Sequence, residues 1–213
     1  QQRLGGQVDH ALSTIEELLK TILDLSRLEA GVTEPQIRLI DVDELFSSLV
    51  GDLAPIARAK SLKLGHRPTR LMVRSDPLML RRIMQNLVAN AVKYTREGRV
   101  LVGIRRQGER VRVEVRDTGP GIPASKHKLI FKEFQRLHDT AGDARGLGLG
   151  LSIVERVCKV LDMPIGLRSA PGRGAVFWTE LPVAAPASVT AAPVALPMHA
   201  VGSLAGCTVL CID

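Results

Sequence analysis

The N-terminal part of the chain has an apolar side chain at every seventh position. Val8, Ile15 and Ile22 form this repeat and Gly31 supplies a stop signal, so the pattern predicts one helix over residues 7–30. A seven-residue apolar repeat is typical of a helix that packs along a partner in a coiled coil or a helical bundle. Because a lone helix cannot bury this seam, we expect a second helix and a second subunit. The alternative is packing on the helix's own domain.

Three further segments have the apolar spacing of helices. This spacing predicts helices over residues 41–60, 76–94 and 149–161. The first two begin with Asp41 and Asp76, whose side chains can cap the free N–H groups of a helix start. The third begins among glycines, which weaken a helix by roughly 1 kcal/mol each relative to alanine. Such a weak start needs a compensating interaction.

Short apolar runs predict five strands, at residues 71–74, 99–105, 110–116, 165–169 and 174–181. A turn at residues 107–109 predicts a hairpin between the second and third, and a turn at residues 171–173 separates the last two. Helices beside antiparallel strand pairs favour the α+β class, with one sheet covered by helices in a two-layer sandwich.

The C-terminal part of the chain differs in composition. Residues 183–203 are rich in alanine and proline and predict a linker, whose prolines are incompatible with a helix across a bilayer. Any membrane attachment is therefore expected through a segment outside this chain. Residues 204–213, LAGCTVLCID, resemble a buried first strand. Because a single strand cannot fold alone, we expect either a piece of a longer polypeptide or a disordered tail.

The composition is that of an ordinary soluble globular protein, with 45% hydrophobic and 24% charged residues. A net charge of +7 and a pI near 9.8 favour affinity for anions such as phosphates. Only 3% of the residues are aromatic, so stacking surfaces for bases are scarce and we expect no nucleic-acid partner. DNA binding through the basic charge is the alternative, but the sequence has no apparent recognition helix. Cys158, Cys207 and Cys211 have neither metal-ligand nor disulfide-scaffold spacing, which fits a reducing cytosol.

The helix predicted over residues 76–94 carries a polar stripe on an apolar surface. Asn86, Asn90 and Lys93 are four and three residues apart, so they share one helix face. An amide oxygen there can bind Mg²⁺, and the lysine can contact phosphate. A solvated polar face is the alternative, but the residues around the stripe are apolar: Leu87, Val88, Ala91 and Val92.

Two shorter motifs follow the hairpin. In DTGPGIP, residues 117–123, Gly119 and Gly121 permit a tight turn and close approach by a ligand. Asp117 comes at the end of a strand, where its carboxylate can accept a hydrogen bond from an exocyclic amine. Taken alone, this stretch is also a good plain turn. The second motif, FKEF at residues 131–134, is compatible with simple packing.

The stretch GLGLGLSIVERV, residues 146–157, has glycine at three alternate positions before a helix. Glycines leave backbone N–H groups unshielded, and a helix start directs several of them toward one point with a partial positive charge. Such a point is an anion site, most naturally for phosphate. A bound phosphate chain therefore explains a glycine-rich helix start, although a lone glycine run is weak evidence.

In this order and spacing, Asn-x-x-x-Asn, Asp-x-Gly-x-Gly, Phe-x-x-Phe and Gly-x-Gly-x-Gly resemble the N, G1, F and G2 boxes of sensor histidine kinases. GRGAVFWTELP, residues 172–182, resembles the last strand of the same domain. LDLSRLEAG, residues 23–31, is similar to the end of the second helix of the dimerisation and phosphotransfer domain. LAGCTVLCID resembles the beginning of a receiver domain, as in a hybrid histidine kinase.

The resemblance implies four parts of the chain. Residues 1–31 are expected to be the second helix of the dimerisation domain, and residues 32–182 a catalytic ATP-binding domain of the Bergerat type, which gyrase shares. Residues 183–203 are the linker, and residues 204–213 the start of a truncated receiver domain.

The resemblance also implies ATP and Mg²⁺ as ligands. Asn90 and Lys93 are expected to act in catalysis, with Asn90 as the Mg²⁺ ligand and Asp117 on the adenine amine. The full set expected to bind nucleotide is Asn86, Asn90, Lys93, Tyr94, Asp117, Gly119, Gly121, Ile122, Arg145, Gly146, Leu147, Gly148, Leu149 and Gly150. Residues 135–145 are expected to form a mobile lid over ATP.

One position bears on the reaction. In the hydrolysing relatives, a glutamate four residues before the metal-binding asparagine activates water. Asn86 stands there in this chain and cannot act as a base. We therefore expect poor hydrolysis of ATP and transfer of its γ-phosphoryl group to a histidine.

The acceptor histidine is expected outside this chain. His10, the only histidine of the first predicted helix, is followed by Ala11 rather than by an acidic residue. The expected partners are a second copy through the N-terminal helix, the acceptor helix and receiver domain of the same parent protein, and a response regulator or phosphotransfer protein. We expect a cytoplasmic location. A nucleotide-binding module of a protein that works mainly as a phosphatase or scaffold is the alternative function.

Overall fold

The computed structural model describes residues 34–133, 135 and 148–183. Within these residues the helices are α2 (Val42–Ala59), α3 (Pro77–Tyr94) and α4 (Gly150–Val160), with short 3₁₀ turns η1 (Ala124–Lys126) and η2 (Leu129–Phe131). The strands are β1 (Arg38–Asp41), β2 (Lys63–His66), β3 (Met72–Ser75), β4 (Arg99–Gln107), β5 (Arg110–Asp117), β6 (Ile165–Ser169) and β7 (Ala175–Pro182).

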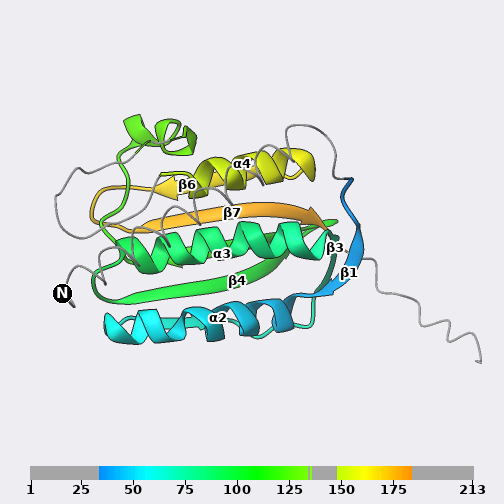
Figure 1. Ribbon diagram of the computed structural model, residues 1–213, viewed down its shortest axis with the longest axis horizontal. Coiled ribbons are helices and arrows are strands. Elements are labelled where there is room, and N and C mark those ends of the chain that lie inside the picture. The colour runs from blue at the N-terminus through cyan, green and yellow to red at the C-terminus, as the bar shows by residue number, and fades with distance from the viewer. Residues whose placement is uncertain (1–33, 134, 136–147, 184–213) are drawn as a thin grey trace, which may run out of the picture.

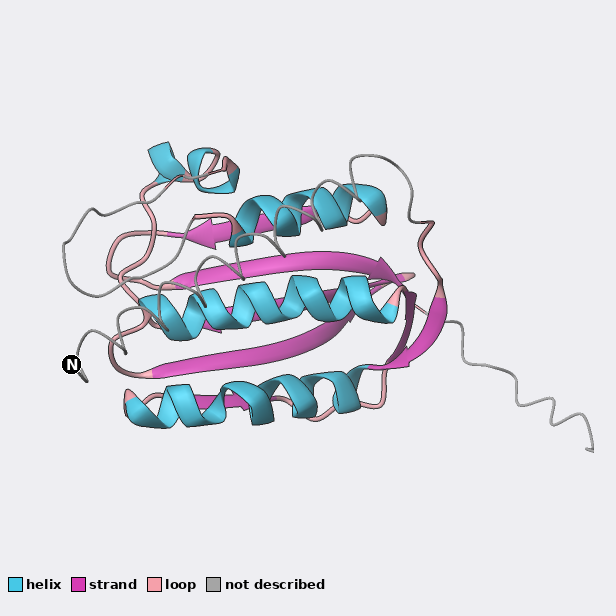
Figure 2. Cartoon of the chain, viewed as in Figure 1, coloured by secondary structure: helices cyan, strands magenta, loops and turns pink. Residues whose placement is uncertain are grey.

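The described residues form two layers, with helices on one face of a sheet (Figure 1). The sheet has five strands in the order β2-β4-β5-β7-β6, in which β2 runs parallel to β4 and the other neighbours are antiparallel. Helix α3 lies between α2 and α4 in front of the sheet, and β1 pairs with β3 at one end of the sandwich (Figure 2). The predicted α+β sandwich is confirmed.

The core lies between the two layers because the strands direct alternate side chains toward the helices. Val102, Val115, Phe177 and Leu167 face one another across four neighbouring strands. Helix α3 contributes the most central residues, and Ile83, Met84 and Val88 are fully buried. Aliphatic side chains dominate this core, as the low aromatic content requires.

Aspartate side chains fix the starts of two helices. Asp41 accepts hydrogen bonds from the N–H groups of Asp43 and Glu44, at 2.8 and 3.2 Å. Asp76 caps α3 in the same way through Leu78 and Met79, at 2.9 Å each. Both predicted caps are confirmed, and such caps are each worth about 0.5–2 kcal/mol.

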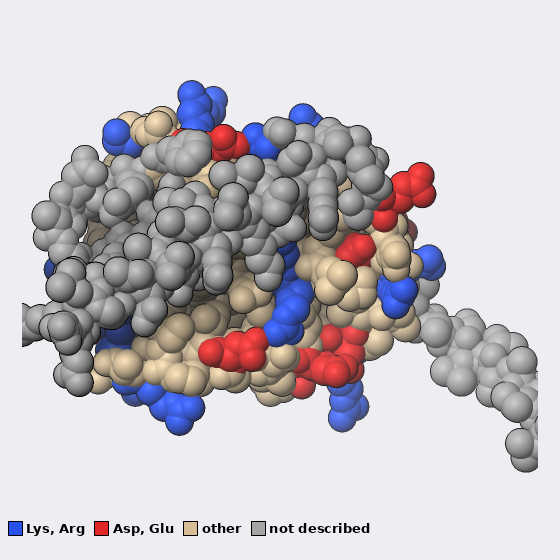
Figure 3. Space-filling view, viewed as in Figure 1, with Lys and Arg blue, Asp and Glu red and all other residues tan. Residues whose placement is uncertain are grey.

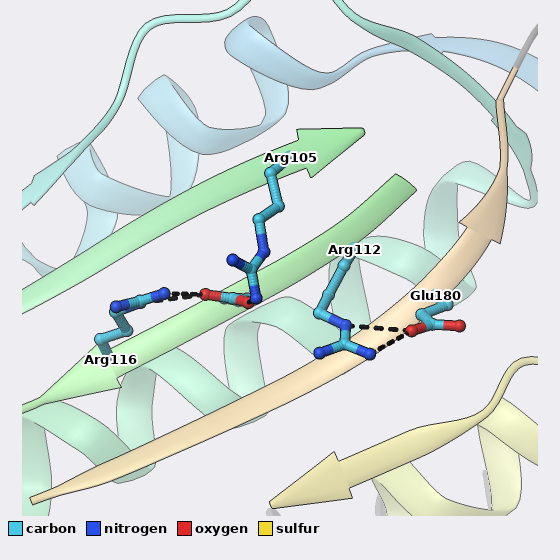
Figure 4. A network of polar contacts seen from close by, with 5 residues as sticks. Arg105, Arg112, Arg116 and Glu180 are labelled. Carbon is cyan, nitrogen blue, oxygen red and sulfur yellow. Dashed lines mark hydrogen bonds and ion pairs between the residues drawn. The ribbon is translucent and has the colours of Figure 1, made fainter. Parts of the chain in front are cut away.

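The other face of the sheet is lined by ion pairs (Figure 4). Arg112 donates two hydrogen bonds to one carboxylate oxygen of Glu180, at 3.0 and 2.5 Å. Glu114 is buried and pairs with both Arg105, at 2.9 Å, and Arg116, at 2.5 Å. Because the buried Glu114 and the half-buried Glu180 both have cationic partners, this face carries charges without leaving either carboxylate unpaired.

The sequence pattern missed two strands, β1 and β2, and the two 3₁₀ turns. The helix predicted over residues 7–30, the linker at 183–203 and the strand at 204–213 lie outside the described residues. Among the residues that the structure describes, no helix combines the length and the apolar character needed to cross a membrane.

Candidate nucleotide-binding site

The polar stripe of α3 lies in the second half of the helix. Asn86 and Asn90 are half-buried, because their neighbours on both sides belong to the core. The side-chain N–H₂ of Asn86 donates to the backbone carbonyl of Arg82 at 2.9 Å. This bond fixes the orientation of the Asn86 amide and directs its oxygen away from its own helix.

Helix α4 begins beside these two asparagines. A Cβ atom placed on Gly150 would lie 2.9 Å from Oδ1 of Asn86 and 3.5 Å from Nδ2 of Asn90. The first distance is shorter than real Cβ contacts, so any side chain at position 150 would displace the Asn86 amide. Two residues earlier, Gly148 has φ +72°, a conformation that favours glycine. Glycine at both positions therefore has a structural reason.

The start of α4 differs from those of α2 and α3. Its N-cap residue is Leu149, which provides no side-chain hydrogen bond, whereas aspartates cap the other two helices. Free N–H groups at a helix start attract anions through their partial positive charge. The uncapped start of α4 next to two side-chain amides is thus suited to hold a phosphate group.

Asp117 ends β5 at the same end of the sandwich. Its Oδ1 accepts hydrogen bonds from the N–H groups of Gly119, at 2.8 Å, and Ala175, at 3.2 Å. Burial raises the pKa of Asp117 above its ordinary value of 3.8, and the two backbone bonds oppose this effect. Both bonds use one oxygen, so the second carboxylate oxygen is left to accept a further donor.

Two backbone contacts hold the loop after Asp117 in place. Gly121 has φ +72°, and a Cβ there would lie 1.9 Å from the carbonyl oxygen of Ala170. Gly174 has φ +68°, and a Cβ there would lie 2.0 Å from the backbone oxygen of Asp117. The loop therefore packs backbone to backbone against the turn before β7, which only glycine permits at these positions.

The end of α3 completes this edge of the fold. Tyr94 is exposed, and the Nζ of Lys93 lies 5.2 Å from the centre of the Tyr94 ring. Thr95, the C-cap residue, is fully buried, and its hydroxyl is the one buried side-chain oxygen or nitrogen without a hydrogen-bond partner among the described residues. A Cβ on Gly119 would lie 3.2 Å from this hydroxyl oxygen.

The structure brings most of the expected site residues to one end of the sandwich in two groups. Asn86 and Asn90 meet Gly150, while Asp117 and Gly119 meet the end of α3 at Tyr94 and Thr95. The side chain of Leu149 is buried in the core, so Leu149 can contact a ligand only through its backbone. The side chain of Ile122 is partly buried and packs against the same core. Arg145, Gly146, Leu147 and residues 136–144 of the expected lid lie outside the described residues.

The FKEF segment is used for packing and for a tie to α4. Phe131 meets Phe177 edge to face, with ring centres 6.4 Å apart. Glu133 forms an ion pair with Arg156 of α4. The segment thus joins the loop after η2 to the helix that begins at Gly150.

Sequence reasoning missed two contributors to this edge. Thr95 directly follows the helix predicted over residues 76–94, but its residue type gave no sign that its hydroxyl would be buried without a hydrogen-bond partner. Ala175 contributes only a backbone N–H to Asp117, which no side-chain pattern can reveal.

On the helix face of the molecule, acidic and basic side chains are interspersed (Figure 3). Arg81 and Asp52, for example, form an ion pair of 2.6 Å between α3 and α2. Lys60 donates to the backbone carbonyls of Val92 and Lys93 at the end of α3, at 3.0 and 2.7 Å. The basic charge among the described residues of this face is therefore spread rather than collected in one patch.

Comparison with known proteins agrees with this geometry. The profile of the family "Histidine kinase-, DNA gyrase B-, and HSP90-like ATPase" matches residues 75–185. Sensor protein GacS of Pseudomonas syringae pv. syringae is 33% identical over 185 residues, which cover 83% of this chain and 20% of GacS. Sensor histidine kinase GacS of Pseudomonas protegens is 32% identical over 185 residues, with the same coverage.

A solved structure has the same fold. Full-length ShkA in complex with AMPPNP matches with a TM-score of 0.71 at 32% sequence identity, over 83% of this chain and 36% of ShkA. The chain therefore spans about a fifth of the length of the two curated relatives and about a third of ShkA.

Proposed function

The chain belongs to the histidine kinase-, DNA gyrase B- and HSP90-like ATPase family, and from this premise we propose a specific role. It is the ATP-binding catalytic region of a two-component sensor histidine kinase. It transfers the γ-phosphoryl group of ATP to a histidine on a helix outside this chain, from which the group passes to an aspartate of a response regulator.

One observation carries this proposal. The start of α4 has no side-chain cap, and Gly150 leaves no room for a Cβ beside Asn86 and Asn90. This arrangement fits a phosphate chain, because the helix N–H groups and the side-chain amides can share one anion and its metal. AMPPNP is an ATP analogue, and its presence in the ShkA structure supports ATP as the ligand.

We assign the phosphate end of the site to α3 and α4. Asn90 holds Mg²⁺ through its amide oxygen, and Lys93 and Asn86 contact the phosphates. Mg²⁺, when bound, supplies positive charge that neutralises the phosphate oxygens. Gly148 and Gly150 present backbone N–H groups, and Arg145, Gly146 and Leu147 are proposed to continue this cradle.

We assign the adenine end to the loop after β5. The free carboxylate oxygen of Asp117 accepts a hydrogen bond from the exocyclic amine of the base, while Gly119, Gly121 and Ile122 line the pocket. Tyr94 lies beside the nucleoside. Two backbone N–H groups already orient the Asp117 carboxylate. The side chain therefore loses little conformational freedom when the base binds.

The nature of Asn86 favours transfer over hydrolysis. An amide cannot take a proton from water, and the Asn86 N–H₂ group is already bonded to the Arg82 carbonyl. Because Asn86 cannot act as a general base for water at the γ-phosphate, attack by water is slow, and a well-positioned histidine becomes the better acceptor. Asn86 thus keeps the hydrolysis of bound ATP slow until an acceptor helix docks.

The flanking segments are assigned by their similarity to sensor kinases. We propose that residues 1–31 belong to a dimerising helix, residues 32–182 to the catalytic domain, residues 183–203 to a linker and residues 204–213 to a receiver domain. The partners are then a second copy of the chain, an acceptor-histidine helix and a receiver or response regulator. We propose a cytoplasmic location for the domain.

Phosphotransfer from labelled ATP tests this function. The full chain is incubated with [γ-³²P]ATP, Mg²⁺ and the acceptor-histidine domain encoded by the same parent gene, and the label on the acceptor is followed. We expect an acid-labile, base-stable phosphohistidine that is lost with Asn90→Ala. Tight nucleotide binding without any transfer would instead support the phosphatase or scaffold alternative.

A further inference from the structure

The hydroxyl group of Thr95 has no hydrogen-bond partner, whereas the other buried side-chain polar atoms of the described residues each have one. Thr95 is 0% exposed, and its Oγ1 is the one atom of this kind among the described residues. Leaving a buried hydroxyl unbonded is unfavourable, so such a group in a folded protein needs an explanation. A ligand that brings the missing partner is one.

The position of Thr95 is fixed by the end of α3. As C-cap residue it donates its backbone N–H to the carbonyl of Ala91 at 3.0 Å, and its side chain turns into the fold rather than toward solvent. The neighbouring Tyr94 side chain is exposed by contrast. The hydroxyl is therefore held in place by the helix whether or not it has a hydrogen-bond partner.

Two oxygens converge on one point beside Gly119. A Cβ placed on Gly119 would lie 2.9 Å from Oδ1 of Asp117 and 3.2 Å from Oγ1 of Thr95. Because glycine has no Cβ, the backbone at Gly119 can lie this close to both oxygens. Thr95 therefore lies near Oδ1 of the carboxylate whose other oxygen the proposed function assigns to the adenine amine.

The two groups differ in what they can offer a base. An ionised carboxylate only accepts hydrogen bonds, whereas a threonine hydroxyl can also donate one. The polar edge of adenine has an amine that donates and an adjacent ring nitrogen that accepts, and guanine has these roles reversed. A carboxylate and a hydroxyl side by side thus complement adenine and oppose guanine.

We propose that Thr95 is a specificity-determining residue of the nucleotide site: its hydroxyl donates to the ring nitrogen of adenine, directly or through one ordered water, beside Asp117. This inference rests on the proposed function, since it needs a nucleotide in that site. Binding then supplies the partner that the hydroxyl lacks. Thr95 also favours adenine over guanine in a way that Asp117 alone does not.

Valine at position 95 tests the inference, because it keeps the shape of threonine and removes the hydroxyl. The full chain and its Thr95→Val variant are titrated with Mg-ADP and with Mg-GDP by calorimetry, and both are unfolded in urea without nucleotide. We expect T95V to bind Mg-ADP about tenfold more weakly, with a smaller preference for ADP over GDP. Without nucleotide, T95V should be at least as stable as the wild type, because an unpaired buried hydroxyl has been removed.

The pair Thr95→Ser and Thr95→Ala repeats the test with a different control. Both variants lose the methyl group, but only serine keeps the hydroxyl, so serine should restore most of the affinity and alanine should not. Equal affinity and equal ADP preference in T95V and the wild type would overturn the inference. So would a loss of stability in nucleotide-free T95V, since that result means the hydroxyl already has a structural partner.

The failure of this inference can be told from failure of the proposed function. If the wild type gives no binding heat with Mg-ADP, the nucleotide site itself is wrong and the inference falls with it. If the wild type binds Mg-ADP, Asp117→Asn binds it more weakly and T95V binds it as the wild type does, the site stands and only the role of Thr95 is overturned.

Discussion

At the scale of single residues, a substitution of Asp117 can weaken nucleotide binding without disturbing the fold. Asparagine at this position keeps the Oδ1 acceptor for the N–H groups of Gly119 and Ala175, but presents an N–H₂ group where the second oxygen stood. We expect Asp117→Asn to fold normally and to bind Mg-ADP about 10- to 100-fold more weakly, because a donor would face the adenine amine. Thermal unfolding and calorimetry measure the two effects. Unchanged affinity would remove Asp117 from the site.

The same carboxyl predicts a pH dependence of stability. Burial raises the pKa of Asp117 above 3.8, so the folded protein binds this proton more tightly than the unfolded chain does. The contribution of this proton to the free energy of unfolding is fully present below the ordinary pKa of Asp117. It is lost as pH rises through the raised pKa of the folded state. The Asp117→Asn variant has no titrating group at this position. As pH rises through this window, its free energy of unfolding should therefore increase relative to that of the wild type. Urea unfolding at several pH values checks this, and a difference that does not change with pH would contradict it.

Gly150 and Gly51 form a matched pair of helical glycines. No heavy atom lies within 4 Å of the position a Cβ would take on Gly51, whereas on Gly150 it would lie 2.9 Å from Asn86 Oδ1. We expect Gly51→Ala to raise the free energy of unfolding by about 0.5–1 kcal/mol. Gly150→Ala should gain less or lose stability, and should weaken Mg-ADP binding because the Asn86 amide must move. Equal gains, with unaltered binding in both variants, would show that Gly150 has no role at the site.

Residue chemistry could be predicted where a side chain itself carries the signal. The spacing of Asn86 and Asn90 gives a common face, and the structure brings that face against Gly150. The surroundings of Thr95 could not be predicted, because its burial and its lack of a hydrogen-bond partner depend on residues distant in sequence, such as Gly119 in the loop after β5. Side-chain type alone does not report such surroundings.

At the scale of elements, the helix caps make a graded prediction. Asp41 is exposed and bonds only to the start of α2, whereas Asp76 is 6% exposed and also accepts the N–H of Gln36 at 2.8 Å. We expect Asp41→Ala to cost about 0.5–1 kcal/mol and Asp76→Ala about 2 kcal/mol. Chemical denaturation gives both values. A cost for Asp41→Ala as large as that for Asp76→Ala would mean that burial and the third bond add nothing.

The helices were predictable and two strands were not, for a physical reason. The predicted helix bounds agree with α2, α3 and α4 to within one residue at each end, because long apolar spacings and capping residues are local signals. β1 has only four residues, nearly all exposed, and β2 has the sequence KLGH without apolar alternation. Each forms because its partner, β3 or β4, offers free backbone groups, and the sequence pattern of the strand itself does not show this.

At the scale of the whole molecule, the topology assembles the site. Helix α3 and the start of α4 meet at one end of the sandwich, where β5 ends and β7 begins. The sandwich class was predictable from the order of the elements. The strand order β2-β4-β5-β7-β6, which brings the loop after β5 beside the turn before β7, was not. This order lets residues about sixty positions apart share one hydrogen-bonded edge, as Asp117 and Ala175 do.

The central claim is that a nucleotide with its magnesium binds between the asparagine face of α3 and the uncapped start of α4. Calorimetric titration of the full chain with Mg-ADP measures this binding directly. The account predicts saturable binding by the wild type and by Gly51→Ala, and its loss in a folded Asn90→Ala variant. A folded wild type without binding heat, or an Asn90→Ala variant that binds as the wild type does, would contradict it.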